Sequence, residues 1–465
     1  MIWLYRLLFA PVFLALLPHY ALRMLRRGGY GRDFAQRFGA FPKLPPKRAG
    51  VRRLWIQAVS VGEVCALEPL LKRLAATGGA EVVLTTTTST ARKIIRERIE
   101  PLVLAAGYFP FDFWLFSRRA WARIQPDALV LMEGELWPEN LHQAAARAVP
   151  VTLVNARLSD RSFRRYSRFK TVARALFGGV GKIGAATAGD AARFAGLGVP
   201  PEKITVTGNL KFDAAADNDC NAAAGTGTAA GADAGVISAP PRAAGAPLVL
   251  LGSSTWPGEE ALLLETLAEA RRRGIAARLL IVPRHAERRR EIAALLEATS
   301  WRWFLRSQRR DIPPDFTGAG GEFDVCVADT TGELRQLTAP AALAFVGKSI
   351  PPNDGGQTPI ECAALGVPVV YGPRMSNFRD ACRGLEEAGA AKRVADAAGA
   401  RDALLALLGA PEELARAGAA ARRWFASNLG ATTATLALLG VAERAPAVPS
   451  TPSPAAAATS SPAAA

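Results

Sequence analysis

Three charged residues that can act on a substrate follow apolar, strand-like runs of the chain. They are Glu63 after residues 54–59, Glu133 after 128–132 and Lys211 after 204–207. A carboxylate held in a cleft can take a proton from a hydroxyl nucleophile. A lysine nearby can neutralise the charge that develops on a leaving phosphate. Together the three residues predict a group-transfer centre at the ends of strands.

Each of these residues also has an ordinary structural explanation. Ser60 and Glu63 have the spacing of a capping box, in which both side chains satisfy the first N–H groups of a helix. Glu133 and Glu135 leave an apolar strand, where a salt bridge explains them as well as a substrate hydroxyl does. Lys211 has the common alternative of a solvated surface lysine. Residue type and spacing leave both explanations open.

The segment 355–361, which reads GGQTPIE, suits the binding of a phosphorylated ligand. It repeats the capping-box pattern, with Thr358 as N-cap, Pro359 at the first helical position and Glu361 as the capping carboxylate. The free N–H groups at such a helix start attract an anion. Arg284, which closes another strand-like run, adds a guanidinium suited to bidentate recognition of phosphate.

Two further turns, 251–255 (LGSST) and 329–334 (DTTGEL), follow strand-like runs in the same half of the chain. Each of these signals is unspecific when taken alone. All of them fall at strand ends, and the carboxyl ends of parallel strands are where α/β proteins bind ligands. This coincidence predicts one site between two domains.

The elements that must position these residues alternate between strand and helix. Strand-like runs occur at residues 54–59, 81–85, 128–132, 149–154 and 204–207, and again at 247–251, 278–282, 323–328, 341–346 and 367–371. Helical stretches separate them, which indicates mostly parallel sheets covered by helices on both faces. We therefore expect an α/β chain with two Rossmann-like domains that face a cleft.

The composition changes abruptly between the two halves. Residues 214–246 are dominated by Ala, Gly, Asp and Pro, which cannot form a core. We expect a membrane anchor at 1–27, an N-terminal domain at 28–213, a disordered linker at 214–246, a C-terminal domain at 247–440 and a disordered tail at 441–465.

The N-terminal residues 2–25 are mostly apolar, and Arg26 and Arg27 follow them. The run is near the length of a bilayer crossing, although Arg6, Pro11 and Pro18 interrupt it. We expect a membrane anchor that either spans the bilayer or lies in its plane, with the basic flank on the cytoplasmic side. A buried core helix is the alternative.

The chain of 465 residues carries a formal charge of +16 and is 50% hydrophobic. This balance is typical of a folded protein with anionic partners, such as acidic lipid or phosphorylated metabolites. The basic residues form no pattern of a nucleic-acid-binding module, so we do not expect nucleic acid as a partner.

The sequence argues against several classes of catalyst. Five cysteines and three histidines are scattered without ligand spacing, so no metal site is expected. The chain has no GxxxxGK[ST] loop and no strand-linked GxGxxG, and no DxD-type metal pair follows a strand-like run. Metal-free transfer of a sugar from a nucleotide carrier to an acceptor remains attractive, with the nucleotide on the C-terminal domain and the acceptor on the N-terminal domain.

Eight motifs together resemble the 3-deoxy-D-manno-octulosonic acid (Kdo) transferases of lipid A assembly. They occur in the family's order over roughly residues 1–430, and as a set they are highly specific. They are WIQAVSVGE (55–63), MEGELWP (132–138), VNARLS (154–159), GNLKFD (208–213), VPRH (282–285), DTTGEL (329–334), AFVGKS (344–349) and the stretch 355–373.

The resemblance implies a GT-B glycosyltransferase that moves Kdo from CMP-Kdo to a lipid A precursor (lipid IVA), with inversion and without a metal or cofactor. It also implies work at the cytoplasmic face of the inner membrane, where donor, acceptor and lipid surface are all anionic. By motif position, the proton acceptor falls on Glu63, and the groups that stabilise the transition state fall on Glu133 and Lys211. The acceptor-binding positions are Arg32 and Arg157. The donor-binding positions are Pro283, Arg284, Thr331, Gly332, Glu333, Thr358, Pro359, Ile360 and Glu361.

The chain departs from the family pattern in its donor region. The family usually reads GGHNPLE, so Gln357 replaces a histidine and Thr358 an asparagine, and Lys348 stands where a glycine is usual. These departures leave open a GT-B transferase that uses another CMP-linked acidic sugar or another acceptor. A non-catalytic membrane-bound scaffold is a further alternative, which the presence of Glu63 and Lys211 disfavours.

Overall fold

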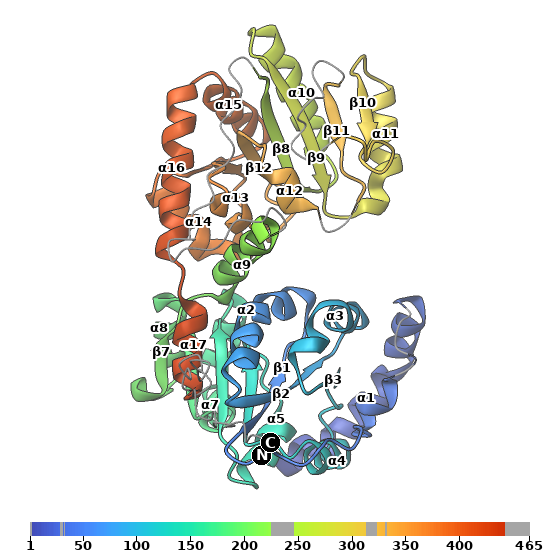
Figure 1. The fold of residues 1–465 in the computed structure, drawn as a ribbon, viewed down its shortest axis with the longest axis vertical. Helices are drawn as coiled ribbons and strands as arrows, with labels where there is room; N and C mark the ends of the chain where they lie inside the picture. Colours follow the sequence, from blue (N-terminus) through green and yellow to red (C-terminus); the bar gives the residue numbers. More distant parts are fainter. Residues whose placement is uncertain are drawn as a thin grey trace, which may run out of the picture.

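The computed structural model describes residues 2–27, 31, 33–224, 246–312, 323–330 and 333–441. These residues form two sheets of seven strands each (Figure 1). The strand orders are β3-β2-β1-β4-β5-β6-β7 and β10-β11-β9-β8-β12-β13-β14. Neighbouring strands pair in parallel, as between β1 and β4 or between β8 and β12. The expected pair of Rossmann-like α/β halves is confirmed.

The N-terminal half contains seven strands and the helices that cover them. The strands are β1 (Arg52–Gln57), β2 (Ala80–Thr86), β3 (Ala105–Tyr108), β4 (Ala128–Met132), β5 (Val151–Ala156), β6 (Lys182–Ala185) and β7 (Ile204–Val206). The helices are α2 (Val61–Thr77), α3 (Ser89–Ile94), α4 (Trp114–Ile124), α5 (Pro138–Ala145), α6 (Asp160–Arg168), α7 (Lys170–Gly178) and α8 (Ala188–Gly196).

The C-terminal half repeats the arrangement. Its strands are β8 (Leu248–Thr255), β9 (Ala277–Pro283), β10 (Trp303–Leu305), β11 (Val325–Val327), β12 (Leu343–Val346), β13 (Val369–Tyr371) and β14 (Ala391–Arg393). Its helices are α10 (Glu259–Arg272), α11 (Arg289–Glu297), α12 (Leu334–Thr338), α13 (Ile360–Ala364), α14 (Arg379–Glu387), α15 (Ala397–Leu408) and α16 (Pro411–Ser427). Short helical turns also occur, among them η6 (Ser376–Phe378).

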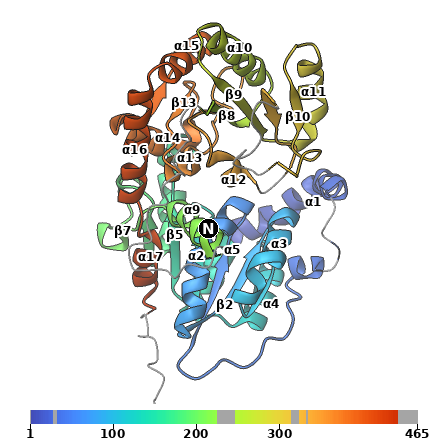
Figure 2. The same ribbon diagram turned by 45° about the horizontal axis from the view of Figure 1, so that its top comes forward.

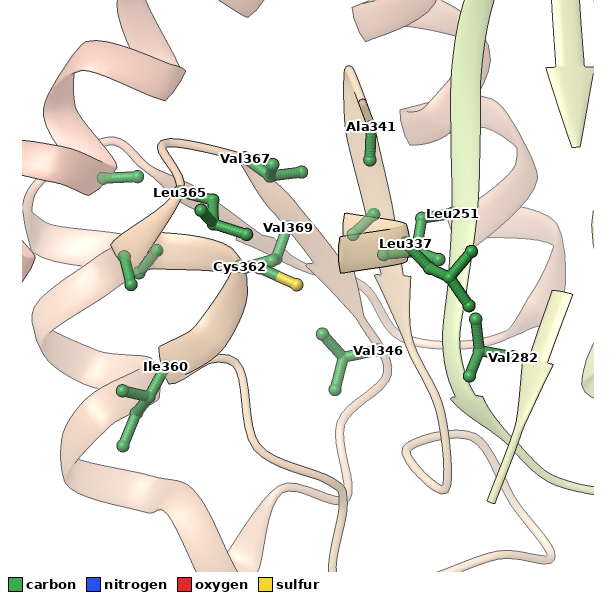
Figure 3. Close-up of a cluster of buried hydrophobic side chains, with 14 of the residues drawn as sticks. Leu251, Val282, Leu337, Ala341, Val346, Ile360, Cys362, Leu365, Val367 and Val369 are labelled. Carbon is green, nitrogen blue, oxygen red and sulfur yellow. The ribbon is translucent and has the colours of Figure 1, made fainter. Parts of the chain in front are cut away.

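The hydrophobic core of the C-terminal half fixes the segment that contains α13. Figure 3 shows Cys362 of α13 beside Val369 and Val346 of the neighbouring strands, and Ile360 belongs to the same buried cluster. Cys362 is only 1% exposed, and Val346 is fully buried. Because these side chains lock α13 onto the sheet, the turn before it is held at the carboxyl end of β12.

One helix joins the two halves. α9 (Leu210–Ala224) contacts α2 of the N-terminal half and α13 of the C-terminal half, and both ribbon views show it between them (Figures 1 and 2). The expected linker start at Ala214 is therefore wrong, because the alanine-rich sequence continues a helix to Ala224. Residues 225–245 of that linker, and the tail from residue 442, lie outside the described residues.

The chain crosses back before it ends. α17 (Ala431–Leu439) follows α16 but contacts α2, α9 and β6 of the N-terminal half, as its position in Figure 1 shows. The expected C-terminal domain, 247–440, includes α17, although α17 packs on the N-terminal half. The expected domain boundaries stay predictions.

The N-terminal residues form a long helix, α1 (Ile2–Arg27), which lies beside α4 and α5 in Figure 1. Its stretch Ile2–Leu22 is long and apolar enough to cross a membrane, by length and composition. Several large apolar side chains on α1 are exposed, with Trp3 and Leu7 at 76% and 72%. This helix is a candidate membrane anchor rather than a buried core helix.

Candidate active site

Glu63 lies in the first turn of α2, directly after β1. The Ser60 hydroxyl accepts a hydrogen bond from the Glu63 N–H at 3.3 Å and donates one to Glu63 Oε1 at 2.7 Å. The Val59 N–H donates to Glu63 Oε2 at 2.9 Å. The expected cap by Ser60 is confirmed, and the same contacts hold the Glu63 carboxylate in one orientation. Glu63 is only 7% exposed.

Glu133 and Lys211 meet where β4 and β7 end. Lys211 Nζ lies 3.0 Å from Glu133 Oε1, and both side chains are about one quarter exposed, 27% and 28%. Glu133 has a positive φ of 54°, a strained conformation for a residue with a side chain. Asn155 Oδ1 accepts the Leu210 N–H at 3.1 Å, which fixes the start of α9 and so places Lys211.

The three predicted catalytic residues interact electrostatically. Burial is the main cause that raises the pKa of Glu63, while hydrogen bonds from Val59 and Ser60 lower it. The negative charge of Glu133 raises this pKa further, and the positive charge of Lys211 lowers it. Glu133 and Lys211 are in direct contact, and both charges act on Glu63.

Glu135 belongs to the same cluster, although the sequence analysis did not select it as a site residue. Burial raises its pKa first, and the charges of Glu63 and Glu133 add to the shift. The only sequence signal was its position beside Glu133 at the end of an apolar strand. Across the described residues, no group of three or more His, Cys, Asp or Glu side chains is placed to hold a metal ion.

Two adjoining cavities open beside this cluster, between the two halves. One of about 440 Å³ is lined by Glu133, Glu135, Lys211 and Arg157, together with residues of η6 and α14. A second of about 240 Å³ shares Lys211 and Arg157 and reaches Ile360 of α13. The cleft therefore has room for ligands from both halves to meet at Lys211.

Arg157, a predicted acceptor-binding residue, also bridges the cleft. Its Nη2 donates to the Asn377 carbonyl at 3.0 Å. Close by, Asp160 at the start of α6 pairs with Arg379 at the start of α14. These contacts hold the two halves against each other at one wall of the cavity.

The predicted donor-binding residues gather at the strand ends of the C-terminal half. Burial raises the pKa of Glu361, while the positive charges of Arg335 and Arg284 lower it, so the three charges lie near one another. Pro283 is the last residue of β9, and Arg284 follows it with an exposed side chain. Arg335 was not predicted, and its spacing in the sequence gave no signal.

The expected capping box at Thr358 and Glu361 is wrong. α13 begins at Ile360, with Pro359 in the N-cap position, where a proline side chain offers no acceptor. The Thr358 hydroxyl instead accepts the Ile360 N–H at 3.3 Å. Glu361 therefore does not cap the helix, and the charges of Arg335 and Arg284 act on its carboxylate instead.

The remaining predicted residues have different outcomes. Glu333 is the N-cap residue of α12; its carboxylate lies 3.7 Å from Arg306 Nε and accepts a hydrogen bond from Thr330. Arg32, Thr331 and Gly332 lie outside the described residues.

Lys348 follows β12 with a positive φ of 60°, where the family pattern has glycine. Its Nζ lies 4.7 Å from the centre of the Trp256 ring, and its carbonyl accepts the Gly356 N–H at 3.0 Å. Lys348 thus supports the turn that precedes α13. Glu133, Asn155, Ser254 and Lys348 all combine positive φ with a place at or next to the carboxyl end of a strand. Such strain concentrates at functional sites.

Comparisons with known proteins show the family and the fold of this chain. Residues 32–214 match a family model described as 3-deoxy-D-manno-octulosonic-acid transferase (kdotransferase). A Bordetella pertussis protein named 3-deoxy-D-manno-octulosonic acid transferase is 36% identical over 429 residues, which cover 89% of this chain and 93% of the relative. A Haemophilus influenzae protein of the same name is 30% identical over 415 residues, which cover 88% and 91%. The crystal structure of UDP-GlcNAc 2-epimerase from Neisseria meningitidis bound to UDP-GlcNAc aligns with a TM-score of 0.56 at 14% identity, over 83% of this chain and 99% of that one. At this identity the structural match shows the shared fold alone.

Proposed function

Because the chain belongs to the Kdo transferase family, a glycosyltransferase family, we propose that it moves Kdo from CMP-Kdo to a lipid A precursor, lipid IVA. The observation that carries this proposal is the pair of Glu133 and Lys211, which lines the cavity between the halves and whose charges act on Glu63. The Glu63 carboxylate, with its raised pKa, is suited to accept a proton, and the ammonium group of Lys211 in the cavity is suited to stabilise an anionic leaving group.

In the proposed reaction Glu63 accepts the proton of an acceptor sugar hydroxyl. The hydroxyl oxygen forms a bond to the anomeric carbon of Kdo while the bond from that carbon to the CMP phosphate oxygen breaks. CMP leaves with the electron pair, and a single displacement of this kind inverts the anomeric carbon. Glu63 is suited to act as the base for two reasons. Hydrogen bonds from the Val59 N–H and the Ser60 hydroxyl fix its carboxylate, and burial raises its pKa toward the working pH.

The leaving phosphate is stabilised by cations from both halves. Lys211 lines the two cavities, and Arg284 lies near Glu361 on the donor side. Glu133 pairs with Lys211 and orients its ammonium group. We propose that these side chains do the work that a divalent cation does in other transferases, so that transfer needs no metal. A chelator such as EDTA should then leave the rate unchanged, and a rate restored only by added Mg²⁺ would refute this part.

We further propose that α1 lies in the plane of the inner membrane, with both halves on the cytoplasmic side. Phe9 stacks on Phe113 at 5.6 Å, and Phe13 contacts Phe111 at 5.0 Å, so the first half of α1 packs on the protein body. If α1 crossed the bilayer, it would have to leave these contacts.

The side chains of α1 that face away from the protein body are exposed and apolar: Trp3, Leu4, Leu7, Leu8, Val12, Leu14, Leu16, Leu17, Tyr20 and Leu22. A net charge of +16 favours an anionic lipid surface.

The direct test is the purified protein with CMP-Kdo and a tetra-acylated lipid A precursor in detergent. We expect a lipid product heavier by one or more Kdo residues, with release of CMP. NMR of the product tests inversion. Absence of any transfer to this acceptor would refute the proposed function.

A second candidate is a transferase for another CMP-linked acidic sugar or another acceptor. Lys348 favours it, because its ammonium group lies over Trp256 beside the predicted donor segment, where the family pattern has glycine. A panel of CMP-sugars separates the two candidates. A second CMP-sugar used faster than CMP-Kdo would support this one.

A further inference from the structure

Two polar side chains near the start of α1 dock on buried carboxylates of the N-terminal half. Arg6 forms a bidentate pair with Glu139, with Nε–Oε2 at 2.8 Å and Nη2–Oε1 at 2.9 Å. The Glu139 side chain is fully buried, and that of Arg6 is 17% exposed. The Tyr5 hydroxyl donates to Asp112 Oδ2 at 2.8 Å. Burying an ion pair is costly unless its geometry is well satisfied, so these contacts hold α1 in one specific position.

Both carboxylates belong to the network that fixes the start of α5. Asp112 lies between β3 and α4, and accepts the N–H groups of Glu139 at 2.9 Å and Asn140 at 3.0 Å. It therefore caps α5 from another part of the chain. The Asn140 side chain also donates to Asp112 Oδ1 at 2.7 Å, and Gln143 donates to Glu139 Oε1 at 2.7 Å.

The start of α5 is also the end of the loop that carries Glu133 and Glu135. Only residues 133–137 connect β4 to α5. Trp137 is the N-cap residue of α5, and its ring packs against Phe109 at 5.4 Å. A connection this short passes any displacement of α5 to Glu133, which must stay in contact with Lys211.

We propose that Arg6 and Tyr5 are positioning residues for the transfer centre. Docked α1 holds the start of α5, and α5 holds the loop 133–137 so that Glu133 meets Lys211. The inference rests on the proposed function only in placing Glu133 in that centre. On this account α1 couples membrane attachment to catalysis, in addition to keeping the protein at the surface.

The test compares single variants of the full chain in detergent, where membrane attachment does not limit the rate. Arg6→Ala removes the ion pair, Arg6→Lys keeps the charge, and Tyr5→Phe removes one hydrogen bond but keeps the ring. Arg272→Ala is the matched control, because it removes an arginine side chain that is 75% exposed and lies on α10 of the C-terminal half, away from α1. For each variant we would measure kcat, KM for both substrates, binding to liposomes and hydrogen exchange over residues 133–145.

We expect Arg6→Ala to lower kcat by about 10- to 100-fold, because small displacements of reacting groups cost rates of this order. KM and liposome binding should change little, and hydrogen exchange over 133–145 should accelerate. Arg6→Lys should recover part of kcat, Tyr5→Phe should show a smaller loss, and Arg272→Ala should match the parent chain. If Arg6→Ala does not fold, Tyr5→Phe carries the same test alone.

An unchanged kcat in a folded Arg6→Ala or Tyr5→Phe variant would overturn the proposal. So would an equal loss of kcat in the Arg272→Ala control. The hydrogen-exchange arm keeps this result separate from the proposed function. If the parent chain transfers no Kdo, accelerated exchange over 133–145 in Arg6→Ala still supports the coupling of α1 to the loop, and unchanged exchange refutes it.

Discussion

At the scale of single residues, Glu63 combines a structural contact with a chemical one. Its carboxylate receives hydrogen bonds from Ser60 and Val59, as in a helix cap, yet it senses the charges of Glu133 and Lys211. Capping and catalysis are therefore compatible explanations here. The cap supplies the fixed orientation that a general base needs.

The first prediction concerns Glu63→Gln, which keeps the size and hydrogen-bonding capacity of the side chain but cannot accept the proton. We expect the transfer rate to fall by roughly 10²- to 10⁴-fold, the usual contribution of a general base. Donor binding and thermal stability should be close to those of the parent chain. Near-normal turnover of a folded variant would remove Glu63 from this role.

The second prediction concerns pH. The base must be deprotonated, so activity should rise with pH through the pKa of Glu63, which burial raises above the usual value of about 4.3. Lys211→Met removes a charge that lowers this pKa, so the acid limb of the kcat/KM profile should move to higher pH. Glu133→Gln removes a charge that raises it, so the limb should move to lower pH. Shifts in the same direction would contradict the proposed cluster.

The third prediction concerns Glu361. The half-buried Glu361 carboxylate, which the charges of Arg284 and Arg335 influence, is suited to accept hydrogen bonds from hydroxyl groups of the donor. Glu361→Gln should weaken CMP-Kdo binding by about tenfold or more, the value of one hydrogen bond to a charged group. It should cost little stability, because Glu361 does not cap α13. Calorimetry with Glu412→Gln as a surface control measures both; equal donor affinity in the two variants would exclude this contact.

At the scale of elements, α9 contacts both halves and carries Lys211 of the candidate active site. Asn155 fixes its start, and Phe212 packs on Trp424 and Phe425 of α16. Asp213 accepts the N–H groups of Gly430 and Thr432 and so caps α17. Lys211 lies between these anchors. The motif GNLKFD therefore contains a site residue together with the residues that place it.

The fourth prediction follows from this cap. Asp213→Ala should lower the free energy of unfolding by about 1 kcal/mol, the typical value of an N-cap. Urea unfolding measures it, with Asp402→Ala as the control, because Asp402 lies on α15 with a side chain that is 69% exposed. A stability equal to that of the control would show that Asp213 does not support α17.

Much of this arrangement could be predicted from the sequence. Long apolar runs such as Ala128–Met132 predicted the central strands. The charged residues that follow such runs predicted the candidate catalytic residues Glu63, Glu133 and Lys211. Short edge strands such as β3 and β14, with the sequences AAGY and AKR, were missed because small or charged residues carry no strand pattern. The path of α17 back to the N-terminal half could not be predicted either, since it depends on tertiary contacts.

At the scale of the whole molecule, the exposed apolar side chains of α1 and the net charge of +16 both suit the proposed association with a membrane. Trp114 and Leu115 at the start of α4 are each 39% exposed and extend the apolar surface beyond α1. Phe113, the residue before Trp114, contacts Phe9 of α1. Association with anionic lipid should therefore combine apolar burial with charge attraction.

The fifth prediction tests this surface. The double change Leu7→Ser and Leu14→Ser should weaken binding to anionic liposomes by at least about tenfold per leucine, from the apolar area that each would bury. Val206→Ser is the control, because Val206 is 53% exposed but lies on β7, away from α1. Co-sedimentation measures the binding. Equal losses in both variants would mean that α1 is not the binding surface.

The most direct test of the central claim is one assay of the purified chain and its Glu63→Gln variant. Each is incubated with CMP-Kdo and the tetra-acylated lipid A precursor, and the lipid products are read by mass spectrometry. The account predicts that the parent chain yields the precursor carrying added Kdo and that the folded variant yields almost none. Equal product from both proteins would contradict the assigned centre, and no product from either would contradict the proposed transfer itself.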